Sequence, residues 1–508
     1  MIVTDTATMK LPTVVLDTTL ADLYRQAGSS YTDKRIGQVL SGFSAAVPLG
    51  PKIPPNRKYI YQDGPFTSSD GISHTDGPTT AIKYLSLVNQ RDAFICGAAP
   101  AIFFHMDSSS QRRRHDQKQV VKTLATLSDA QRPHLVFCDG PECIPIDETG
   151  IDCIACKVIN DDLEKYNNGV PLETHWFLNS KRALADSGLP TPKCVAVTVD
   201  GFPADAQSCC ALCIGSGLQG FNQATFGGAG TFIVRTEDER QNIIDDLGKG
   251  FLSRLLSAVN AANSHLEPAT MLLSDLVQDP VGDYGVTFFV NEKGRQPLFL
   301  GVSKQMIVDD TAWVGSIIDY KQQNELRLKF GSLINRISDW LQSYGYLGPA
   351  GADILEDADG TFHVVDLNVR TTGSCALPLL RTHFTSRGLS CASAFSIDVE
   401  KRRDDFLEMF PREFQAGRMC IVSWYEDEES GSSLAELVVG GEDENRLKSL
   451  MDRVNEVSKN VTFCRGAMNI GGSDRLDAWD NRRNTKREIN RSIINDRSGA
   501  SSSPPHES

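Results

Sequence analysis

The stretch that decides the fold is GADILEDADGTFHVVDLNVRTTGS, residues 351–374, in which two apolar runs flank the pair Asp359-Gly360. An Asp-Gly pair is a strong signal for a two-residue β-hairpin turn, because such a turn needs positive φ at both positions. If these two residues form the loop, counting outwards along both strands places Asp353 directly opposite Asp366. The sequence therefore predicts a hairpin with two carboxylates facing each other.

A third polar side chain joins this pair. Side chains alternate between the two faces of a strand, so Asn368 shares the face of Asp366 and lies diagonal to Asp353. Like charges directly opposite each other destabilise a strand pair, and a divalent cation between them reverses the sign of that interaction. Two carboxylates and an amide oxygen suit Mg²⁺, which keeps water ligands and bridges to nucleotide phosphates. The alternative is a longer, solvated turn with the acids on an outer face.

Composition excludes several classes of protein. The chain has 508 residues, 40% hydrophobic and 23% charged, as in a globular protein with one or two cores or several lobes. Its formal net charge of −14 argues against a nucleic-acid partner, which needs a clustered basic surface. No run of about eighteen apolar residues occurs, so we expect no membrane span. The N-terminus lacks a basic start followed by an apolar block, so we expect a cytoplasmic protein without a secretory signal.

The cysteines do not form a recognisable framework. There are 13 of them, scattered along the chain, and they are expected to be reduced thiols. Cys153 and Cys156 form one CxxC pair, and Cys209, Cys210 and Cys213 form CCxxC. A zinc site needs four ligands, and neither cluster has a second pair at matching spacing. We therefore assign the cysteines no chemistry and interpret them as small hydrophobic residues.

The chain divides into four expected segments. Residues 1–175 form an N-terminal α/β domain, in which glycine-bounded apolar runs such as PAIFF and HLVFC predict a parallel sheet. Residues 176–265 form a small subdomain, beginning with a helix, a stop at GLPTP and the strand CVAVTV. Residues 266–478 form a larger subdomain with further strands, one long helix and a closing β-α unit. Residues 479–508 have almost no apolar content and are expected to be a disordered tail.

The order of these parts resembles the ATP-grasp superfamily over residues 176–385. A helix with a lysine precedes GLPTP, followed by the Gly-rich TFGGAG, a strand entering a hinge, and GADIL…DG…VVDLNVR. The sharpest feature is the spacing Asp-x12-Asp-x-Asn-x-Arg, where family members usually carry Glu-x-Asn in place of Asp-x-Asn. The resemblance implies an α/β fold in which an N-terminal α/β, pre-ATP-grasp-like domain precedes a two-lobed ATP-grasp fold.

The resemblance also implies an activity, that of an ATP-dependent carboxylate–amine ligase. Such an enzyme activates a small carboxylic acid, here expected to be an amino acid, as an acyl phosphate, and an amine then displaces phosphate. ATP and Mg²⁺, or Mn²⁺ in its place, are the implied cofactors. The implied partners are the small-molecule carboxylate and amine, with a homodimer as an open alternative to a monomer. Two other functions stay open: a bicarbonate-phosphorylating carboxylase-type member, and an ATP-binding protein of this fold that has lost turnover.

Five residues have implied roles near the phosphates, besides the metal ligands. Arg370 would point to phosphate or to the acyl intermediate, since its planar fork suits bidentate oxyanion binding. Lys304 would neutralise phosphate or meet the carboxylate substrate, and Lys181 would bind the α- and β-phosphates. Gly373 and Ser374 would let backbone approach the substrate.

The resemblance also implies nucleotide contacts. A Gly-rich lid would contain Gly227, Gly228 and Gly230, and a hinge strand whose backbone reads the adenine edge would contain Asp275, Leu276 and Val277. Asp283 would be the carboxylate that binds the ribose.

One departure from the family pattern concerns a second ATP lysine, usually found on the strand before the Gly-rich loop. Here no lysine lies between Lys193 and that loop. Either Lys304 or Arg235 substitutes for it, or the ATP site is weakened, or residues 205–224 are not a faithful stretch of sequence. Three glycines interrupt the strand expected there and favour the last explanation.

Overall fold

The computed structural model describes most of the chain up to Ser458. The described residues are 11–41, 49–60, 77–106, 109–198, 220–223, 231–234, 236–238, 240–241, 257, 259–308 and 312–458. The chain divides into two units, Met1–Ala467 and Met468–Ser508, and the tail predicted for 479–508 lies outside the described residues. In the described part, no helix combines the length and apolar character needed to cross a membrane.

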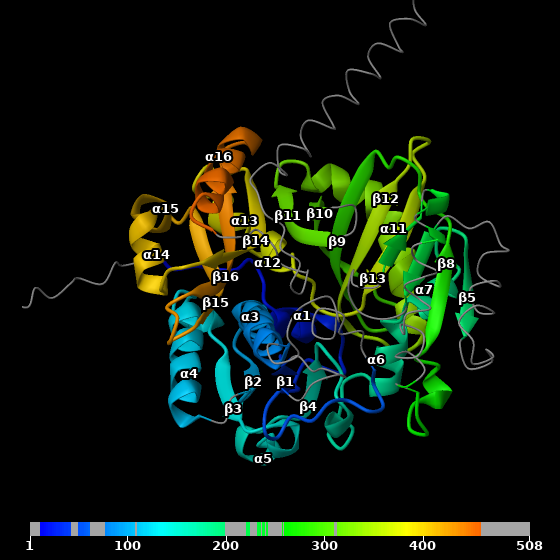
Figure 1. Ribbon diagram of the computed structural model, residues 1–508, viewed down its shortest axis with the longest axis horizontal. Coiled ribbons are helices and arrows are strands. Elements are labelled where there is room, and N and C mark those ends of the chain that lie inside the picture. Colours follow the sequence, from blue (N-terminus) through cyan, green and yellow to red (C-terminus); the bar gives the residue numbers. More distant parts are fainter. Residues whose placement is uncertain are drawn as a thin grey trace, which may run out of the picture. The chain divides into compact units, whose positions relative to one another are not determined.

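The first sheet is parallel, as the glycine-bounded apolar runs predict. Its order is β3-β2-β1-β4, and Figure 1 shows the four strands side by side. The strands are β1 (Ile36–Val39), β2 (Pro100–Phe104), β3 (His134–Cys138) and β4 (Cys153–Cys156). From β1 the chain moves outwards to β2 and β3, then returns to place β4 on the other side of β1. The direction of winding therefore reverses between β1 and β4.

The second sheet has eight antiparallel strands in the order β13-β12-β9-β10-β11-β14-β16-β15. These are β9 (Gly282–Val290), β10 (Leu298–Val308), β11 (Ala312–Asp319), β12 (Gly348–Glu356), β13 (Phe362–Asn368), β14 (Cys391–Val399), β15 (Met419–Glu426) and β16 (Ser433–Gly441). A third, smaller antiparallel sheet has the order β5-β8-β6-β7. Its strands are β5 (Cys194–Thr198), β6 (Gly220–Gln223), β7 (Thr231–Ile233) and β8 (Thr270–Ser274). A parallel sheet followed by two antiparallel sheets agrees with the predicted α/β fold.

Helices cover these sheets. The longest are α3 (Gly77–Cys96), α4 (Ser110–Leu124), α11 (Gln323–Ser343) and α16 (Glu444–Asn455). The shorter ones are α1 (Leu20–Ala27), α5 (Ile146–Thr149), α6 (Leu172–Leu178), α7 (Lys181–Ala185), α12 (Ala376–Leu379), α13 (Arg381–Thr385), α14 (Arg403–Met409) and α15 (Pro411–Gln415). The 3-10 turns are Asp129–Gln131, Pro141–Cys143, Asp161–Leu163 and Ser264–Leu266. The long helix α11 packs on β9 and β10, whereas α16 packs on β14 and β16.

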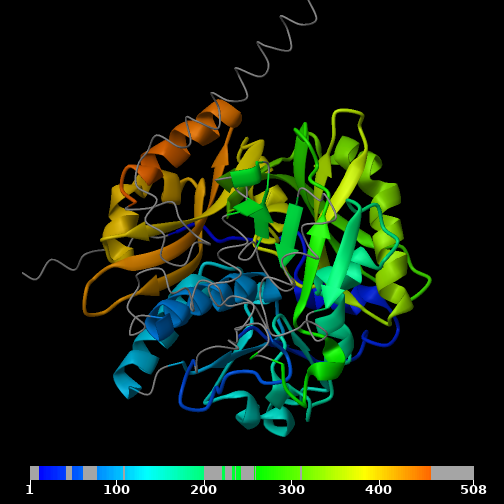
Figure 2. The same ribbon diagram turned by 45° about the vertical axis from the view of Figure 1, so that its right-hand side comes forward.

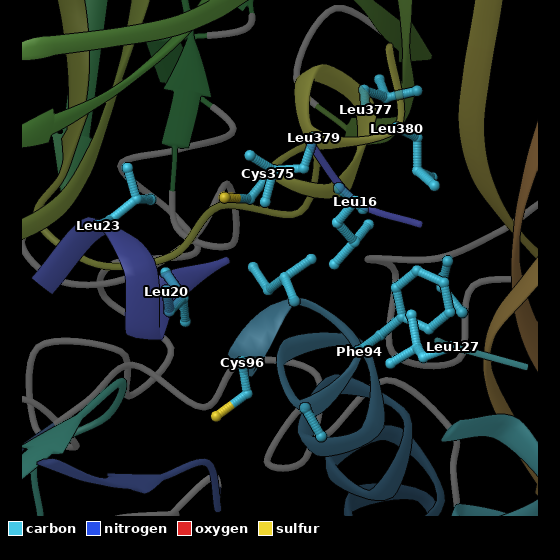
Figure 3. Close-up of a cluster of buried hydrophobic side chains, with 14 of the residues drawn as sticks. Leu16, Leu20, Leu23, Phe94, Cys96, Leu127, Cys375, Leu377, Leu379 and Leu380 are labelled. Atoms are coloured by element: carbon cyan, nitrogen blue, oxygen red, sulfur yellow. The ribbon is translucent and has the colours of Figure 1, made fainter. Parts of the chain in front are cut away.

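One hydrophobic core joins the N-terminal domain to the segment that follows β13. Leu20 and Leu23 of α1, Phe94 of α3 and Leu377 and Leu379 of α12 are all buried in it, and Figure 3 shows these side chains on their three helices. Burying each such side chain stabilises the fold by about 1.5–3 kcal/mol. This core fixes the position of the chain directly after the predicted metal-binding hairpin.

The cysteines fit their interpretation as hydrophobic residues. Every cysteine in the described ranges is a free thiol. Cys153 is buried in β4 and Cys156 is half-buried at its end. Burial raises the pKa of the Cys156 thiol to about 12, so this thiol stays protonated at neutral pH. The second cluster, Cys209, Cys210 and Cys213, lies outside the described residues.

The edge strand β15 is covered by α3, which lies along it in both views (Figures 1 and 2). The buried side chain of Gln90 on α3 forms two hydrogen bonds with the backbone of Trp424. Its Nε2 donates to the Trp424 carbonyl at 2.8 Å, and its Oε1 accepts from the Trp424 N–H at 3.1 Å. Gln90 thus replaces the strand neighbour that an edge strand lacks.

We expect Gln90→Met to lower the free energy of unfolding by about 1–3 kcal/mol, because two buried backbone groups lose their partner. Urea denaturation measures the change. Gln111→Met is the matched control, since exposed Gln111 has only a 3.4 Å bond to Glu428, and its effect should stay within about 0.5 kcal/mol. Equal effects of the two substitutions would contradict the role given to Gln90.

Candidate active site

The hairpin 351–374 forms as predicted, but by a different turn. A two-residue loop would pair Ala358 with Thr361; instead the Asp357 N–H donates to the Thr361 carbonyl at 3.1 Å, which leaves a three-residue loop. Gly360 takes the left-handed conformation at its end, with φ +79°. The predicted turn is therefore wrong, because the side chain of Asp357 accepts hydrogen bonds from two N–H groups of the loop and stabilises the longer form.

The facing carboxylates are confirmed despite this turn. The register of β12 and β13 shifts by one residue next to Asp353, and this irregularity cancels the offset from the longer loop. As a result Asp353 pairs with Asp366, while Ile354 pairs with Val364 on the opposite, buried face. Asn368 lies on the face of the two acids, and its Nδ2 is 3.4 Å from Asp366 Oδ2.

The two acids differ in their electrostatic surroundings. Burial, together with the negative charges of Asp366 and Asp283, raises the pKa of Asp353 well above its usual value. Burial also acts to raise the pKa of Asp366, but Lys181 and Arg370 outweigh it and lower that pKa. Asp353 therefore keeps its proton more readily than Asp366, and a cation bound between them would stabilise its ionised form.

Asp283 and Gln305 complete this face of the sheet. Gly285 pairs with Asp353 on one side and with Ser303 on the other, so residues two positions away from it share the face of Asp353. The side-chain amide of Gln305 donates a hydrogen bond to Asp353. A side chain on Gly285 would meet Gln305 and Ser303, so glycine there leaves room beside the acids. Gln305 is not among the site residues predicted from the sequence.

Lys304 does not join the cluster. It pairs with Tyr284, which in turn pairs with Ile354, so its side chain lies on the face opposite to Asp353. There its amine is 3.4 Å from Glu444 Oε1, at the start of α16. The sequence identified the strand correctly, but the face depends on a register that becomes known only from the fold.

Lys181 does join the cluster. Ser180 caps α7 by accepting a hydrogen bond from the Ala183 N–H at 3.1 Å, as the sequence allows. The cap starts a new helix at Lys181, whose amine forms an ion pair with Asp366 Oδ1. The side chain of Lys181 is only 12% exposed, so this ion pair is little screened by solvent.

Arg370 is held by Asn179, the C-cap residue of α6. Asn179 Oδ1 accepts hydrogen bonds from the Val369 N–H and from Arg370, both at 3.0 Å. Asn179 Nδ2 and His175 Nε2 both donate to the Val369 carbonyl, at 3.2 and 2.7 Å. Burial lowers the pKa of His175 to about 4, so the ring is neutral at pH 7. Asn179 and His175 thus fix the strand end that carries Arg370.

The predicted hinge strand is shorter than expected. Strand β8 ends at Ser274, because its partners β5 and β6 begin at residues that pair with Ser274. Asp275, Leu276 and Val277 instead lie in the segment that connects β8 of the small sheet to β9 of the large one. Asp275 is exposed, and its N–H donates to the Lys193 carbonyl at 2.8 Å.

Several predicted contacts cannot be placed. Gly227, Gly228, Gly230 and Arg235 lie outside the described residues, as does most of the stretch 205–224. Two further residues can be placed. Gly373 touches the ring of Trp313, because a Cβ there would lie 2.5 Å from it. The Ser374 hydroxyl is 3.3 Å from that of Thr372.

These donor atoms fit a cation that also keeps water and phosphate ligands. Within the described ranges, no three His, Cys, Asp or Glu side chains are grouped so as to hold a metal ion by themselves. Asp353, Asp366 and Asn368 offer two carboxylates and one amide oxygen, which leaves further positions to water and phosphate. Mg²⁺ is commonly held in this way, by one or two carboxylates and the phosphates of a nucleotide.

Three solved structures are similar to the chain, each with a TM-score below 0.5. Biotin carboxylase from Campylobacter jejuni matches with TM-score 0.42 and 16% identity, covering 64% of this chain and 82% of its own. An L-amino acid ligase from Bacillus licheniformis matches with TM-score 0.40 and 12% identity, covering 64% and 88%. N5-carboxyaminoimidazole synthase from Aspergillus clavatus matches with TM-score 0.42 and 10% identity, covering 84% and 98%.

Comparison of sequences shows no family for the chain. No family model matches the chain. Among curated proteins, pollen receptor-like kinase 2 from Arabidopsis thaliana is 25% identical over 215 residues. That match covers 38% of this chain, which spans only 30% of the length of the relative.

Proposed function

We propose that the chain is an ATP-dependent ligase of the ATP-grasp type. It activates a small carboxylic acid as an acyl phosphate, couples the acyl group to an amine, and releases ADP and phosphate. The observation that carries the proposal is the pairing of Asp353 with Asp366 across two antiparallel strands, with Asn368 on the same face. The order of motifs along residues 176–385 supports it.

In this proposal the chain acts by position and charge. Mg-ATP, when bound, supplies the phosphoryl group and the cation that the facing acids lack. Asp353, Asp366 and Asn368 would hold that cation, and Lys181 and Arg370 would orient phosphate oxygens. Phosphoryl transfer needs positioning and electrostatic stabilisation more than covalent catalysis, so a site without a nucleophile suits it. Fixed cations also need no rearrangement when charge develops on the transferred group.

The predicted nucleotide contacts are retained with one change. Leu276 and Val277 join the small sheet to the large one, and we propose that their backbone reads the adenine edge. Asp283 is close enough to Asp353 to raise its pKa. This proximity favours a place for Asp283 beside the metal ligands over the ribose contact that the resemblance implies.

Trapping with hydroxylamine tests the reaction. An acyl phosphate reacts with hydroxylamine to give a hydroxamate, so incubation with Mg-ATP and a panel of small carboxylates should yield hydroxamate and ADP in equal amounts. ADP without any hydroxamate would contradict carboxylate activation. Turnover that depends on bicarbonate alone would select the carboxylase-type alternative. Nucleotide binding without ADP formation would select a binding protein, against which the intact face of acids, asparagine and arginine argues.

A further inference from the structure

A small cavity lies next to Arg370. Its lining is mostly apolar, and its polar side chains include Gln38 at the end of β1, Lys157 directly after β4, Asn168, Arg370 and Thr371. Its volume is about 40 Å³. The cavity thus opens at the carboxyl ends of β1 and β4, between which the winding of the parallel sheet reverses. Open α/β sheets bind ligands at such a reversal.

Three polar side chains of this cavity have atoms with no hydrogen-bond partner among the described residues. They are Gln38 Nε2, Asn168 Oδ1 and Thr371 Oγ1. Gln38 and Thr371 are 5% and 6% exposed. The Lys157 side chain is 8% exposed, and its amine is paired with Asp92 at 2.7 Å. Burying a polar group without a partner is unfavourable, so three such groups around one cavity point to a bound molecule.

The lining specifies the chemistry of that molecule. Arg370 brings a positive charge, Lys157 brings a second one that is paired with Asp92, and the side chains of Gln38 and Thr371 can donate hydrogen bonds, which together suit a carboxylate. Among the described residues that line the cavity, none is Asp or Glu, and the nearby Asp92 is already paired with Lys157, so an ammonium group would find no free counter-charge. A water needs about 10–15 Å³ measured in this way, so a volume near 40 Å³ admits a carboxylate with only a short chain.

The same cavity is coupled to the metal-binding hairpin through one side chain. The charge of Arg370 lowers the pKa of Asp366 and also that of Lys157. Arg370 lines the cavity and is close enough to Asp366 to affect its pKa, so it lies near both sites. A carboxylate in the cavity would meet this guanidinium at the end of the site where phosphate is expected.

We infer that this cavity binds the carboxylate substrate of the proposed ligase, a short acid without an ammonium group. The inference rests on the proposed function and narrows it, since the sequence analysis expected an amino acid. A zwitterion would bring a cation next to Lys157 and Arg370, where like charges repel.

Calorimetric titration of the whole chain with acetate, in the absence and in the presence of MgADP, tests the site. Acetate should bind in at least one of these conditions. Acetamide, which lacks the charge, and glycine, which adds an ammonium group, should bind at least tenfold more weakly. No acetate binding in either condition, as expected for a cavity that holds only water, would overturn the inference. Glycine binding as tightly as acetate would overturn the exclusion of amino acids.

Thr371→Val locates the binding. The Thr371 hydroxyl has no hydrogen-bond partner among the described residues, so its removal should leave the fold intact while weakening acetate at least fivefold. Lys157→Met is less suitable, because it removes the closer of two cations that pair with the buried Asp92. Ser338→Ala is the matched control, since it also removes a buried, unpartnered hydroxyl, but on α11. Unchanged acetate affinity in Thr371→Val would place binding elsewhere and overturn the inference.

Titration with MgADP alone separates this inference from the proposed function. MgADP binding without acetate binding would remove the carboxylate site and leave the ATP-dependent function standing. Acetate binding that Thr371→Val weakens, without any MgADP binding, would support the cavity as a carboxylate site and contradict the ligase.

Discussion

Asp366→Asn should reduce ADP formation by about a thousandfold or more while the chain keeps its fold. The substitution removes one of two facing charges that would hold Mg²⁺, and it also removes the carboxylate that pairs with Lys181. Losing a group that stabilises developing charge costs about a hundred- to a thousandfold in rate, and weakening a metal ligand adds to that cost. Turnover with the carboxylate panel measures the effect, and far-UV circular dichroism checks the fold.

Asp359→Asn is the matched control for this substitution. It removes the same charge from the same hairpin, at an exposed position of the turn, and turnover should stay within about twofold of the unmodified chain. If Asp366→Asn is as active as this control, the assignment of Asp366 as a metal ligand is refuted.

Lys181→Met should weaken ATP binding at least tenfold and change how the chain responds to Mg²⁺. Without Lys181, Asp366 faces Asp353 with no lysine beside it, and the pair is only partly exposed. We therefore expect the free energy of unfolding to fall by about 1–3 kcal/mol, less than for a fully buried pair. Mg²⁺ alone should restore more stability in this variant than in the unmodified chain, because the ion takes the place of the lost cation.

Urea denaturation with and without MgCl₂ measures this response. Arg182→Met is the control, since Arg182 is the next residue on the same helix and pairs with Glu267 instead. It should leave both ATP binding and the Mg²⁺ response unchanged. An equal Mg²⁺ response in Lys181→Met, in Arg182→Met and in the unmodified chain would contradict a cation site beside Lys181.

The hairpin shows what the sequence could predict. Asp353 lies opposite Asp366 although the predicted turn is wrong, because the apolar residues around them allow only one register to bury Ile354 and Val364. One register shift, between Asp353 and Ile354, compensates for the extra residue in the loop. Apolar alternation thus determined the pairing more strongly than the turn signal did.

The same alternation of side chains explains why the prediction for Lys304 was wrong. A one-residue step along a strand moves a side chain to the other face, so the difference between Lys304 and Gln305 decides which of them reaches Asp353. Sequence spacing cannot resolve that step without the register of β9 and β10. The cavity residues Gln38 and Lys157 were missed for another reason. They come together only because β1 and β4 are neighbours in the sheet, and their sequence separation carries no signal of that contact.

In the proposed ligase, Asp353 and Asp366 together hold a metal–nucleotide complex, and titration of Mn²⁺ in the presence of ADP, followed by electron paramagnetic resonance, measures this binding. We expect that the unmodified chain removes the signal of free Mn²⁺ only when ADP is present, and that a chain carrying both Asp353→Asn and Asp366→Asn does not. If the doubly substituted chain binds Mn²⁺ and ADP with unchanged affinity, the facing carboxylates do not hold the metal–nucleotide complex, and the proposed ligase activity is contradicted.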